Sequence, residues 1–328
     1  MRVLVVTNMW PSAERPHWGA FVKSQADSLA AAGCTNTLYE IEGWKSMGRY
    51  VQALRELPEL ARRCGAELVH AHYGYSGAAC ARVKLPLVVS FCGDDLLGRP
   101  DDHGRLSLKS RALIPLSAWA ARRADAVIVK SEEMRRVIAN VPDVQVIPNG
   151  VNLERFTPVP RDEARDTLGW RRDGHVLLFA ANPEEPRKNF ALAQGVETAL
   201  RARGLDVRLE WVYGRPPEAV VAAMCASDVL LLPSFHEGSP NTVKEAMACG
   251  LPVVAAPVGD CEERLRDLPP SAVVPRTVEA FTDATARALA SPTRGEGRAR
   301  IAELSTARVA ARVLQVYERA VARHRKGR

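Results

Sequence analysis

The sequence lacks the features that define several large classes of protein. No apolar run approaches the ~20 residues that a membrane-spanning helix needs. The N-terminal stretch MRVLVVTNMW becomes polar after a few apolar residues, which is too soon for a secretory signal peptide. The seven cysteines are an odd number and include no Cys-x-x-Cys pair, which argues against a disulfide framework. We therefore expect a cytoplasmic protein.

Low-complexity segments and short-period repeats are also absent from the sequence. The composition is that of an ordinary globular protein, with 47% hydrophobic and 25% charged residues. A chain of 328 residues is long for one domain and comfortable for two. Length and composition together favour a two-domain protein.

Short aliphatic runs alternate with helix-length segments along the chain. Near-continuous runs of Val, Leu and Ile between helices are typical of parallel strands that are covered on both faces. The expected strands are Val3–Thr7, Thr37–Ile41, Leu68–His72, Leu87–Phe91, Ala126–Val129, Val144–Ile147, Val176–Ala180, Val207–Val212, Val229–Leu232, Val253–Ala255 and Ala272–Val274. The expected helices include Ala20–Ala32, Tyr50–Cys64, Ser107–Arg123 and Ser131–Asn140. The pattern predicts an α/β fold.

The strand series divides into two groups. One sheet of eleven parallel strands would be unusual. The series breaks at Pro148–Pro160, where prolines and a glycine mark a linker. We therefore expect two doubly wound, Rossmann-like domains facing a cleft, residues 1–150 and residues 151–306.

The last helix, residues 307–328, is expected to return toward the first domain, because it has apolar residues at helical spacing. Those residues are Val309, Val313, Val316 and Ala320. The net charge of the chain is +7, and this segment carries seven Lys or Arg against Glu318 alone. A solvated helix end is the simpler interpretation, and attraction to an anionic membrane or a pyrophosphate-bearing lipid is the alternative. Nucleic acid is a less favoured partner for this segment, because no recognition motif of aromatic and basic residues accompanies the charge.

A string with two glutamates, HEGSPNTVKEAMACGLPVV, spans residues 236–254 and follows a predicted strand. Glu237 and Glu245 have seven residues between them. We expect Ser239 to cap the helix that holds Glu245, with Pro240 in its first turn. Both carboxylates then border one space at the carboxyl end of a strand, where open α/β sheets bind ligands.

Taken alone, each glutamate would be read as an exposed or salt-bridged residue, but the full string resembles the hallmark of the retaining family-4 glycosyltransferases (glycosyl transferases group 1), which have the GT-B fold. The hallmark has Glu-Gly-x-Pro at its start and Glu-Ala-x-Ala-x-Gly-x-Pro-Val-Val at its end. VIPNGVNLERFTP (146–158) resembles the family's interdomain linker, and TNMWPSAERPHWGAFVKSQADSLAAAG (7–33) resembles its first strand, glycine loop and helix. VVSFCGDDLLG (88–98) is similar to members of bacterial surface-polysaccharide assembly, teichuronic-acid type included.

The resemblance implies a hexosyltransferase-type enzyme that moves a sugar, with retained configuration, from a nucleotide-diphosphate sugar to a hydroxyl of a glycan, lipid-linked or small-molecule acceptor. The family's favoured mechanism is front-face, in which the leaving phosphate helps to deprotonate the acceptor. It implies no metal and no cofactor besides the donor substrate, a UDP-sugar or a GDP-sugar. Residues 1–150 would form the acceptor side and residues 151–306 would bind the donor. We expect no nucleic acid partner, and a cytoplasmic location or a peripheral one at the inner face of the membrane.

The resemblance also gives roles to individual residues. Lys188, with Arg187 beside it, would bind the donor diphosphate and stabilise the leaving group, because a fixed cation offsets developing negative charge. Glu237 would hold hydroxyls of the transferred sugar. Glu245 would bind the ribose diol, because a carboxylate accepts two hydroxyl hydrogen bonds. The other expected donor contacts are Gly19, Gly238, Ser239, Pro240, Asn241 and Thr242.

No metal site is expected from the sequence. Asp94 and Asp95 are adjacent, which differs from the Asp-x-Asp metal motif of the other glycosyltransferase fold. His70 and His72 lie on one face of a predicted strand, but two histidines without a third ligand do not predict a metal site.

The chain departs from the family pattern at three places. Cys92 stands where the family often has a histidine near the sugar, and Asn182 stands where an arginine commonly precedes the lysine by six residues. A single helix, Pro217–Ala226, occupies a stretch where the family usually adds a strand and a helix that help to hold the nucleobase. The donor base therefore stays open.

Two other functions remain open at the level of sequence. Nucleotide-sugar 2-epimerases share the two-domain fold, although their constellation of histidine and acidic residues is not found here. A non-catalytic nucleotide-sugar-binding subunit is the second alternative, suggested by Cys92 and by the short second domain.

Overall fold

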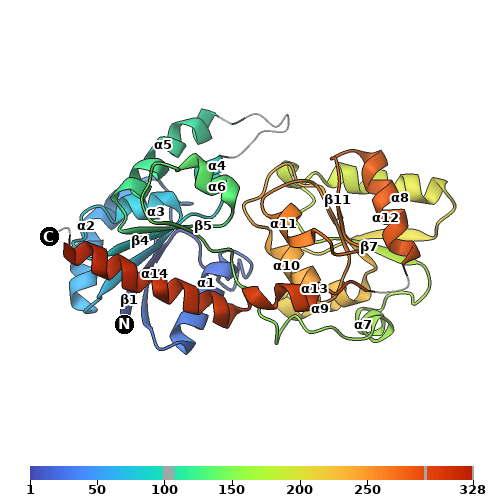
Figure 1. Ribbon diagram of the computed structural model, residues 1–328, viewed down its shortest axis with the longest axis horizontal. Coiled ribbons are helices and arrows are strands. Elements are labelled where there is room, and N and C mark those ends of the chain that lie inside the picture. The colour runs from blue at the N-terminus through green and yellow to red at the C-terminus, as the bar shows by residue number, and fades with distance from the viewer. Residues whose placement is uncertain (99–105, 107, 292–293, 327–328) are drawn as a thin grey trace. The chain divides into compact units, whose positions relative to one another are not determined.

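The computed structural model in Figure 1 describes residues 1–98, 106, 108–291 and 294–326. The described chain forms two compact units. The N-terminal unit contains the residues up to Gly150 together with the C-terminal segment from Thr306 onward, and the C-terminal unit extends from Val151 to Ser305. Each unit is built around one parallel sheet.

Six parallel strands form the sheet of the N-terminal unit, in the order β2-β1-β3-β4-β5-β6. The chain order reverses between β1 and β3, where Val3 lies opposite Leu68, which is the arrangement of a doubly wound sheet. The strands are β1 (Arg2–Thr7), β2 (Thr35–Glu40), β3 (Leu68–His72), β4 (Leu87–Ser90), β5 (Ala126–Val129) and β6 (Val144–Val146). The helices are α1 (Ala20–Ala31), α2 (Gly48–Arg63), α3 (Gly74–Ala79), α4 (Asp94–Leu97), α5 (Leu108–Arg123), α6 (Glu132–Val137) and α14 (Thr306–Lys326).

Five parallel strands form the sheet of the C-terminal unit, in the order β11-β10-β9-β7-β8. The strands are β7 (His175–Phe179), β8 (Val207–Trp211), β9 (Val229–Leu232), β10 (Val253–Ala255) and β11 (Ala272–Val273). The helices are α7 (Arg161–Leu168), α8 (Phe190–Ala202), α9 (Pro217–Ala226), α10 (Asn241–Ala248), α11 (Cys261–Leu265), α12 (Val278–Ala290) and α13 (Gly297–Ile301), with 3₁₀ turns at Pro186–Lys188 (η1) and Ala302–Leu304 (η2).

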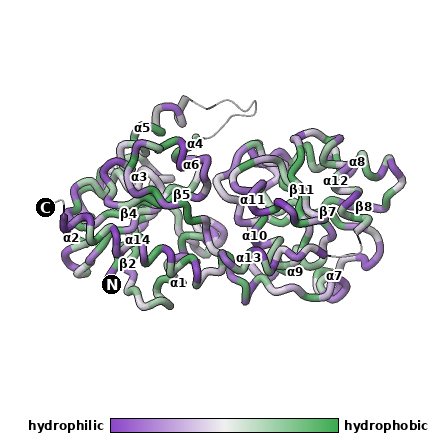
Figure 2. Tube along the Cα trace, viewed as in Figure 1, coloured by the Kyte–Doolittle hydropathy of each residue, from purple (hydrophilic) through white to green (hydrophobic). Residues whose placement is uncertain are grey.

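The eleven strands expected from the aliphatic runs are confirmed, and their ends differ by at most two residues. The central strands are buried on both faces, as in β5, where all four residues of Ala126–Val129 are inaccessible to solvent. In Figure 2 central strands such as β4 and β5 are among the green, hydrophobic segments of the trace. Continuous burial explains why their sequences read as unbroken aliphatic runs instead of alternating ones. The expected α/β fold with two doubly wound parallel sheets is therefore confirmed.

Helix α14 packs within the N-terminal unit, against α1, β4 and β5. Its buried face consists of Val309, Ala310, Val313, Val316, Tyr317 and Ala320. The hydroxyl of Tyr317 lies 2.7 Å from Nδ1 of His70, whose Nε2 lies 2.7 Å from the hydroxyl of Ser90. Burial lowers the pKa of His70 to about 3, so the imidazole is neutral and acts as a hydrogen-bonded core residue. Among the helices that the structure describes, none is long and apolar enough to cross a membrane.

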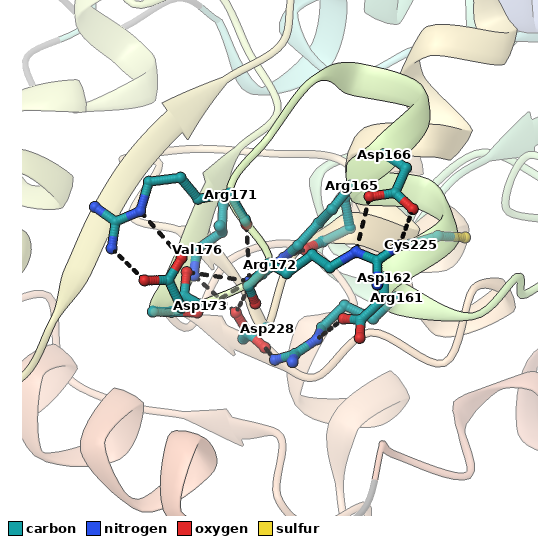
Figure 3. Close-up of polar contacts among 12 residues, drawn as sticks. Arg161, Asp162, Arg165, Asp166, Arg171, Arg172, Asp173, Val176, Cys225 and Asp228 are labelled. Carbon is teal, nitrogen blue, oxygen red and sulfur yellow. Dashed lines mark hydrogen bonds and ion pairs between the residues drawn. The ribbon is translucent and has the colours of Figure 1, made fainter.

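A buried arginine links segments at the amino-terminal ends of the strands of the C-terminal sheet (Figure 3). Arg165 is inaccessible to solvent, and its guanidinium donates to Oδ2 of Asp228 at 2.7 Å and to the carbonyl oxygen of Ala226 at 2.9 Å. The same carboxylate accepts from Arg161 at 3.0 Å and from the N–H of Val176 at 2.7 Å. Asp228 therefore joins α7 to the starts of β7 and β9.

Asp228→Asn should destabilise the C-terminal unit by about 3 kcal/mol, because it leaves a buried guanidinium without its counter-ion. The measurement is urea or thermal unfolding followed by circular dichroism. Asp173→Asn is the matched control, because Asp173 pairs with Arg171 at the surface, where the side chains are 76% and 61% exposed, and its loss should be nearly neutral. Equal stability of the Asp228 variant and the wild type would contradict this role.

Candidate functional site

The candidate site of the C-terminal unit lies at the edge of the sheet where its strands end. The loop after β9 carries Glu237, the turn after β7 carries Arg187 and Lys188, and α10 follows the β9 loop with Glu245. Because β7 and β9 are hydrogen-bonded neighbours, their carboxyl ends lie side by side. The topology therefore brings the predicted lysine, arginine and both glutamates to the edge at which open α/β sheets bind ligands.

Glu237 is a buried carboxylate held by two cations. Its Oε1 lies 2.6 Å from Nζ of Lys188, and its Oε2 lies 3.1 Å from Nη1 of Arg187. The side chain of Glu237 is 10% exposed, and those of Lys188 and Arg187 are 18% and 17% exposed. Three predicted site residues are thus in direct contact. Arg187 also pairs with Glu185 at 2.9 Å, and this second carboxylate is 41% exposed.

The electrostatics of this cluster keep Glu237 ionised. Burial opposes the ionised form, but the charges of Lys188 and Arg187, with hydrogen bonds from Lys188 and Ser234, outweigh burial and hold the pKa of Glu237 at about 2. The carboxylate is therefore a permanent anion at neutral pH. Because its oxygens already bond to two cations, it is a poor base and a poor nucleophile.

The turn η1 is fastened to the glutamate loop through its backbone. The carbonyl oxygen of Arg187 accepts from the N–H of Phe235 at 2.9 Å, and Nη1 of Arg187 donates to the carbonyl oxygen of His236 at 2.8 Å. Asn189 has a left-handed backbone, with φ 56°, and its amide donates to the carbonyl oxygen of Pro233 at 3.3 Å. The left-handed residue ends η1 before α8 begins, so a short 3₁₀ turn that precedes the helix carries Arg187 and Lys188.

Arg276 contacts the glutamate loop, and no sequence pattern indicated it. It follows β11, and its guanidinium donates to the carbonyl oxygens of Ser234 at 3.0 Å and of Phe235 at 3.2 Å, above the Phe235 ring. No motif indicates this contact, because more than forty residues separate the partners in the sequence. The arginine supports the peptide groups that lead into Glu237.

Glu245 occupies a different environment on α10. Val243, Ala246 and Met247 form the buried side of the helix, and Glu245 is partly exposed between them. Burial raises the pKa of Glu245 to about 7, although the nearby charge of Lys244 acts in the opposite direction. The two glutamates therefore differ, since Glu237 is always charged and Glu245 changes its charge near neutral pH.

The predicted cap of α10 was wrong. The residue that precedes the helix is Pro240, which has no side-chain group that could cap the first turn. The hydroxyl of Ser239 instead donates to Oδ2 of Asp260 at 2.9 Å and accepts from Nζ of Lys244 at 3.0 Å. A buried ammonium group and a buried carboxylate compete for this hydroxyl more strongly than a backbone N–H does. Asn241 and Thr242 begin the helix and are partly exposed.

Two of the predicted glycines, Gly238 and Gly19, lie in closely packed loops. The backbone of Gly238 contacts Gly259 so closely that a Cβ on Gly259 would lie 2.7 Å from the Gly238 carbonyl oxygen. Gly19 belongs to the N-terminal unit, where it precedes α1 with φ 70°. A Cβ there would lie 2.3 Å from the carbonyl oxygen of Met9, so glycine is required by the loop itself.

Sequence comparisons decide the family of the chain. The model of Glycosyltransferase Family 4 matches residues 1–155, and the model of Glycosyl transferases group 1 matches residues 170–291. Both glutamates and both cations of the site lie in the second match. The chain belongs to the group 1 glycosyltransferases of family 4.

Curated relatives of this glycosyltransferase include a putative teichuronic acid biosynthesis glycosyltransferase, TuaC, of Bacillus subtilis. It is 24% identical over 88% of this chain and 89% of its own length. The D-inositol 3-phosphate glycosyltransferase of Geodermatophilus obscurus is 28% identical over 61% of this chain. That alignment covers 54% of the relative, so the chain spans about half the length of some curated relatives that it matches.

Solved structures place the glycosyltransferase in the GT-B fold. A sucrose-phosphate synthase from Thermosynechococcus elongatus has a TM-score of 0.77, with 19% identity and coverage of 98% of this chain and 100% of that one. Anabaena Alr3699/HepE, solved in complex with UDP and glucose, has a TM-score of 0.67, with 15% identity and coverage of 97% and 99%. At such identities the likeness shows the fold alone.

Two departures of this glycosyltransferase from its family have defined environments. The Asn182 side chain accepts from the N–H of Glu184 at 3.0 Å and begins the turn that leads to Lys188. The N–H groups of Cys92 and Gly93 donate to the carboxylate of Asp95, which also accepts from Gly74. Burial raises the pKa of the Cys92 thiol above its ordinary value, so the thiol stays protonated where the family often has a histidine.

Proposed function

We propose that the protein is a retaining glycosyltransferase that moves a sugar from a nucleoside diphosphate sugar to a hydroxyl of a glycan, lipid-linked or small-molecule acceptor. The observation that carries the proposal is the contact of Lys188 and Arg187 with the buried Glu237 at the carboxyl edge of the sheet. Two cations in a desolvated space suit a diphosphate, because electrostatic attraction is strong where water is excluded.

The residues of the C-terminal unit would divide the donor among them. Lys188 and Arg187 would bind the diphosphate, and Glu237 would accept hydrogen bonds from hydroxyls of the transferred sugar. The first turn of α10, at Asn241 and Thr242, would add backbone N–H groups, which lack intrahelical partners in the first turn of any helix. Glu245 would bind the ribose diol.

Four further residues complete the donor contacts that we propose. Gly238, Ser239 and Pro240 connect Glu237 to α10, and their backbone would follow the diphosphate. Gly19 of the N-terminal unit would meet the donor from its glycine loop. These contacts depend on backbone groups, because the Ser239 hydroxyl is already shared between Lys244 and Asp260.

The chemistry would be a front-face displacement. The bond between the anomeric carbon and the phosphate oxygen breaks, and the acceptor oxygen bonds to the same face of the sugar. The acceptor proton passes to the departing phosphate, so the products are the glycoside and a nucleoside diphosphate. No enzyme nucleophile is required. This agrees with the state of Glu237, whose oxygens are engaged by two cations. Lys188 and Arg187 would offset the charge on the leaving group without a divalent metal.

We propose a role in surface-polysaccharide assembly and, as donor, a UDP-sugar or a GDP-sugar. TuaC is a relative along most of the chain, and Alr3699/HepE was solved with UDP.

If the acceptor is lipid-linked, the enzyme would act as a peripheral protein at the inner face of the membrane. The basic last turn of α14, Arg323–Lys326, would then contact anionic lipid. Co-sedimentation with anionic but not neutral vesicles tests this contact, and equal pelleting with both would contradict it.

Lys188→Ala should lower turnover by about 10²–10³, because it removes a preorganised cation from the developing charge. The donor is first found by thermal shift with UDP, GDP, ADP and their sugars, and transfer is then followed by release of the nucleoside diphosphate. Arg187→Ala should also lower turnover, since Arg187 contacts both Glu237 and the His236 carbonyl group. EDTA should leave the rate unchanged.

Arg203→Ala is the matched control for these variants. Arg203 pairs with Asp283 at the surface of the same unit, where both side chains are about half exposed, so its loss should not affect transfer. Full activity of Lys188→Ala, or activity that EDTA abolishes and manganese restores, would contradict the proposed stabilisation of the leaving group by Lys188 without a metal.

A further inference from the structure

A buried lysine lies between the two glutamates of the motif. Lys244 directly precedes Glu245 on α10 and is 1% exposed. Its ammonium group donates to the hydroxyl of Ser239 at 3.0 Å and approaches the carbonyl oxygen of Ser239 at 3.5 Å. Burying an ammonium group is costly unless its hydrogen bonds are satisfied. The proposed donor contacts give this lysine no role, because it points into the unit and away from solvent.

The hydrogen bonds continue from Ser239 into the loop after β10. The Ser239 hydroxyl has one proton, which it donates to Asp260 at 2.9 Å while it accepts from Lys244. The same Asp260 oxygen accepts from Nε of Arg264 at 3.0 Å. Asp260 is 6% exposed, so this carboxylate is compensated almost entirely within the protein. The result is a chain of charges and hydrogen bonds from Lys244 through Ser239 and Asp260 to Arg264.

The loop after β10 also packs directly on the glutamate loop. Gly259 has φ 56°, and a Cβ on it would lie 2.7 Å from the carbonyl oxygen of Gly238 and 3.1 Å from that of Glu237. A larger residue would push the two loops apart. At its outer end Arg264 pairs with Glu263 and Glu303, both at 2.8 Å, which fixes its guanidinium. Two independent contacts, one polar and one steric, therefore hold the loop of Asp260 against that of Glu237.

We propose that Lys244, Asp260 and Arg264 are positioning residues for the donor site, which act through Ser239. This hydrogen-bonded series joins the loop that holds Glu237 to the helix that holds Glu245. It therefore sets how far the two carboxylates lie from each other and from the N-terminus of α10. Small displacements of such groups weaken binding, because the ligand must then reorganise the site. This inference rests on the proposed function of the site as a binder of nucleoside diphosphates.

The same unit offers a natural comparison for a purely structural ion pair. Arg165 and Asp228 form a buried pair at the opposite edge of the sheet, where strands begin. That pair lies away from both glutamates in the topology, since it is fastened to the starts of β7 and β9. Loss of the Arg165–Asp228 pair or of the hydrogen bonds from Lys244 to Asp260 should destabilise the unit. Only loss of the hydrogen bonds from Lys244 to Asp260 should also change ligand affinity.

The test is calorimetric titration of the full chain with UDP, GDP and ADP. Lys244→Met keeps the length and burial of the side chain and removes its charge. The affinity for the nucleotide that binds the wild type should fall by about tenfold or more. Asp228→Asn should bind that nucleotide within about twofold of the wild type, although it unfolds at a lower temperature. Each variant is titrated well below its own unfolding temperature.

A second set of variants tests the path through Ser239. Ser239→Ala should weaken nucleotide binding as Lys244→Met does. The double variant should bind the nucleotide no more weakly than the more damaging single variant, because the two substitutions break the same hydrogen-bonded connection. Ser239→Thr keeps the hydroxyl and should retain most of the affinity. Asp260→Asn keeps the size of the side chain, removes its charge and should weaken binding, and it replaces Lys244→Met in the titration if the latter does not fold.

The outcomes separate the inference from the function on which it rests. If the wild type binds none of the three nucleotides, the proposed function fails. If the wild type binds but Lys244→Met binds equally well, the positioning role is wrong. Equal weakening by Asp228→Asn would also overturn it, because general destabilisation would then explain the loss. Additive losses in the double variant would show that Lys244 does not act through Ser239.

Discussion

The site depends on one interaction, the contact of Lys188 and Arg187 with the buried carboxylate of Glu237. Two cations in a desolvated space would repel each other, and the anion between them lets the loop after β9 and the turn after β7 close together. Arg187 also pairs with Glu185 at 2.9 Å, so two carboxylates balance the two cations. A diphosphate would compete for Arg187 with Glu185, which is 41% exposed, while the buried Glu237 stays in place and ionised because its pKa is about 2. The same contact can stabilise the protein and prepare it for an anionic ligand.

The fold separates binding from stability along one sheet. The segments that support the site follow β7, β9, β10 and β11, and they carry Lys188, Glu237, Asp260 and Arg276. Parallel strands bring these segments to a common edge although they are far apart in sequence. At the other edge Arg165 and Asp228 fasten the strand starts with no proposed part in binding. A motif read from one stretch of chain is thus completed by three other loops.

Sequence patterns were sufficient where the chemistry is local. The aliphatic runs indicated the strands that the structure describes, because the central ones are buried on both faces and carry few polar residues. The resemblance gave Lys188 and Glu237 as site residues but did not predict their contact with each other. Patterns failed where a distant partner decided the outcome. The hydroxyl of Ser239 was expected to cap α10, but it bonds to Asp260 and Lys244. Arg276 was missed for the same reason, since its contacts with the glutamate loop leave no periodic signal.

The most direct test of this account is the affinity of the nucleoside diphosphate as a function of pH, measured between pH 5.5 and 8.5. Burial raises the pKa of Glu245 to about 7, and only its ionised form accepts hydrogen bonds from both ribose hydroxyls. Affinity should therefore rise as pH increases through about 7 and level off above it. In Glu245→Gln binding should be weaker, and only the smaller rise that comes from ionisation of the ligand's own terminal phosphate, with a pKa of about 6, should remain. A wild-type affinity that is independent of pH, or a Glu245→Gln variant that keeps the same profile, would contradict the account.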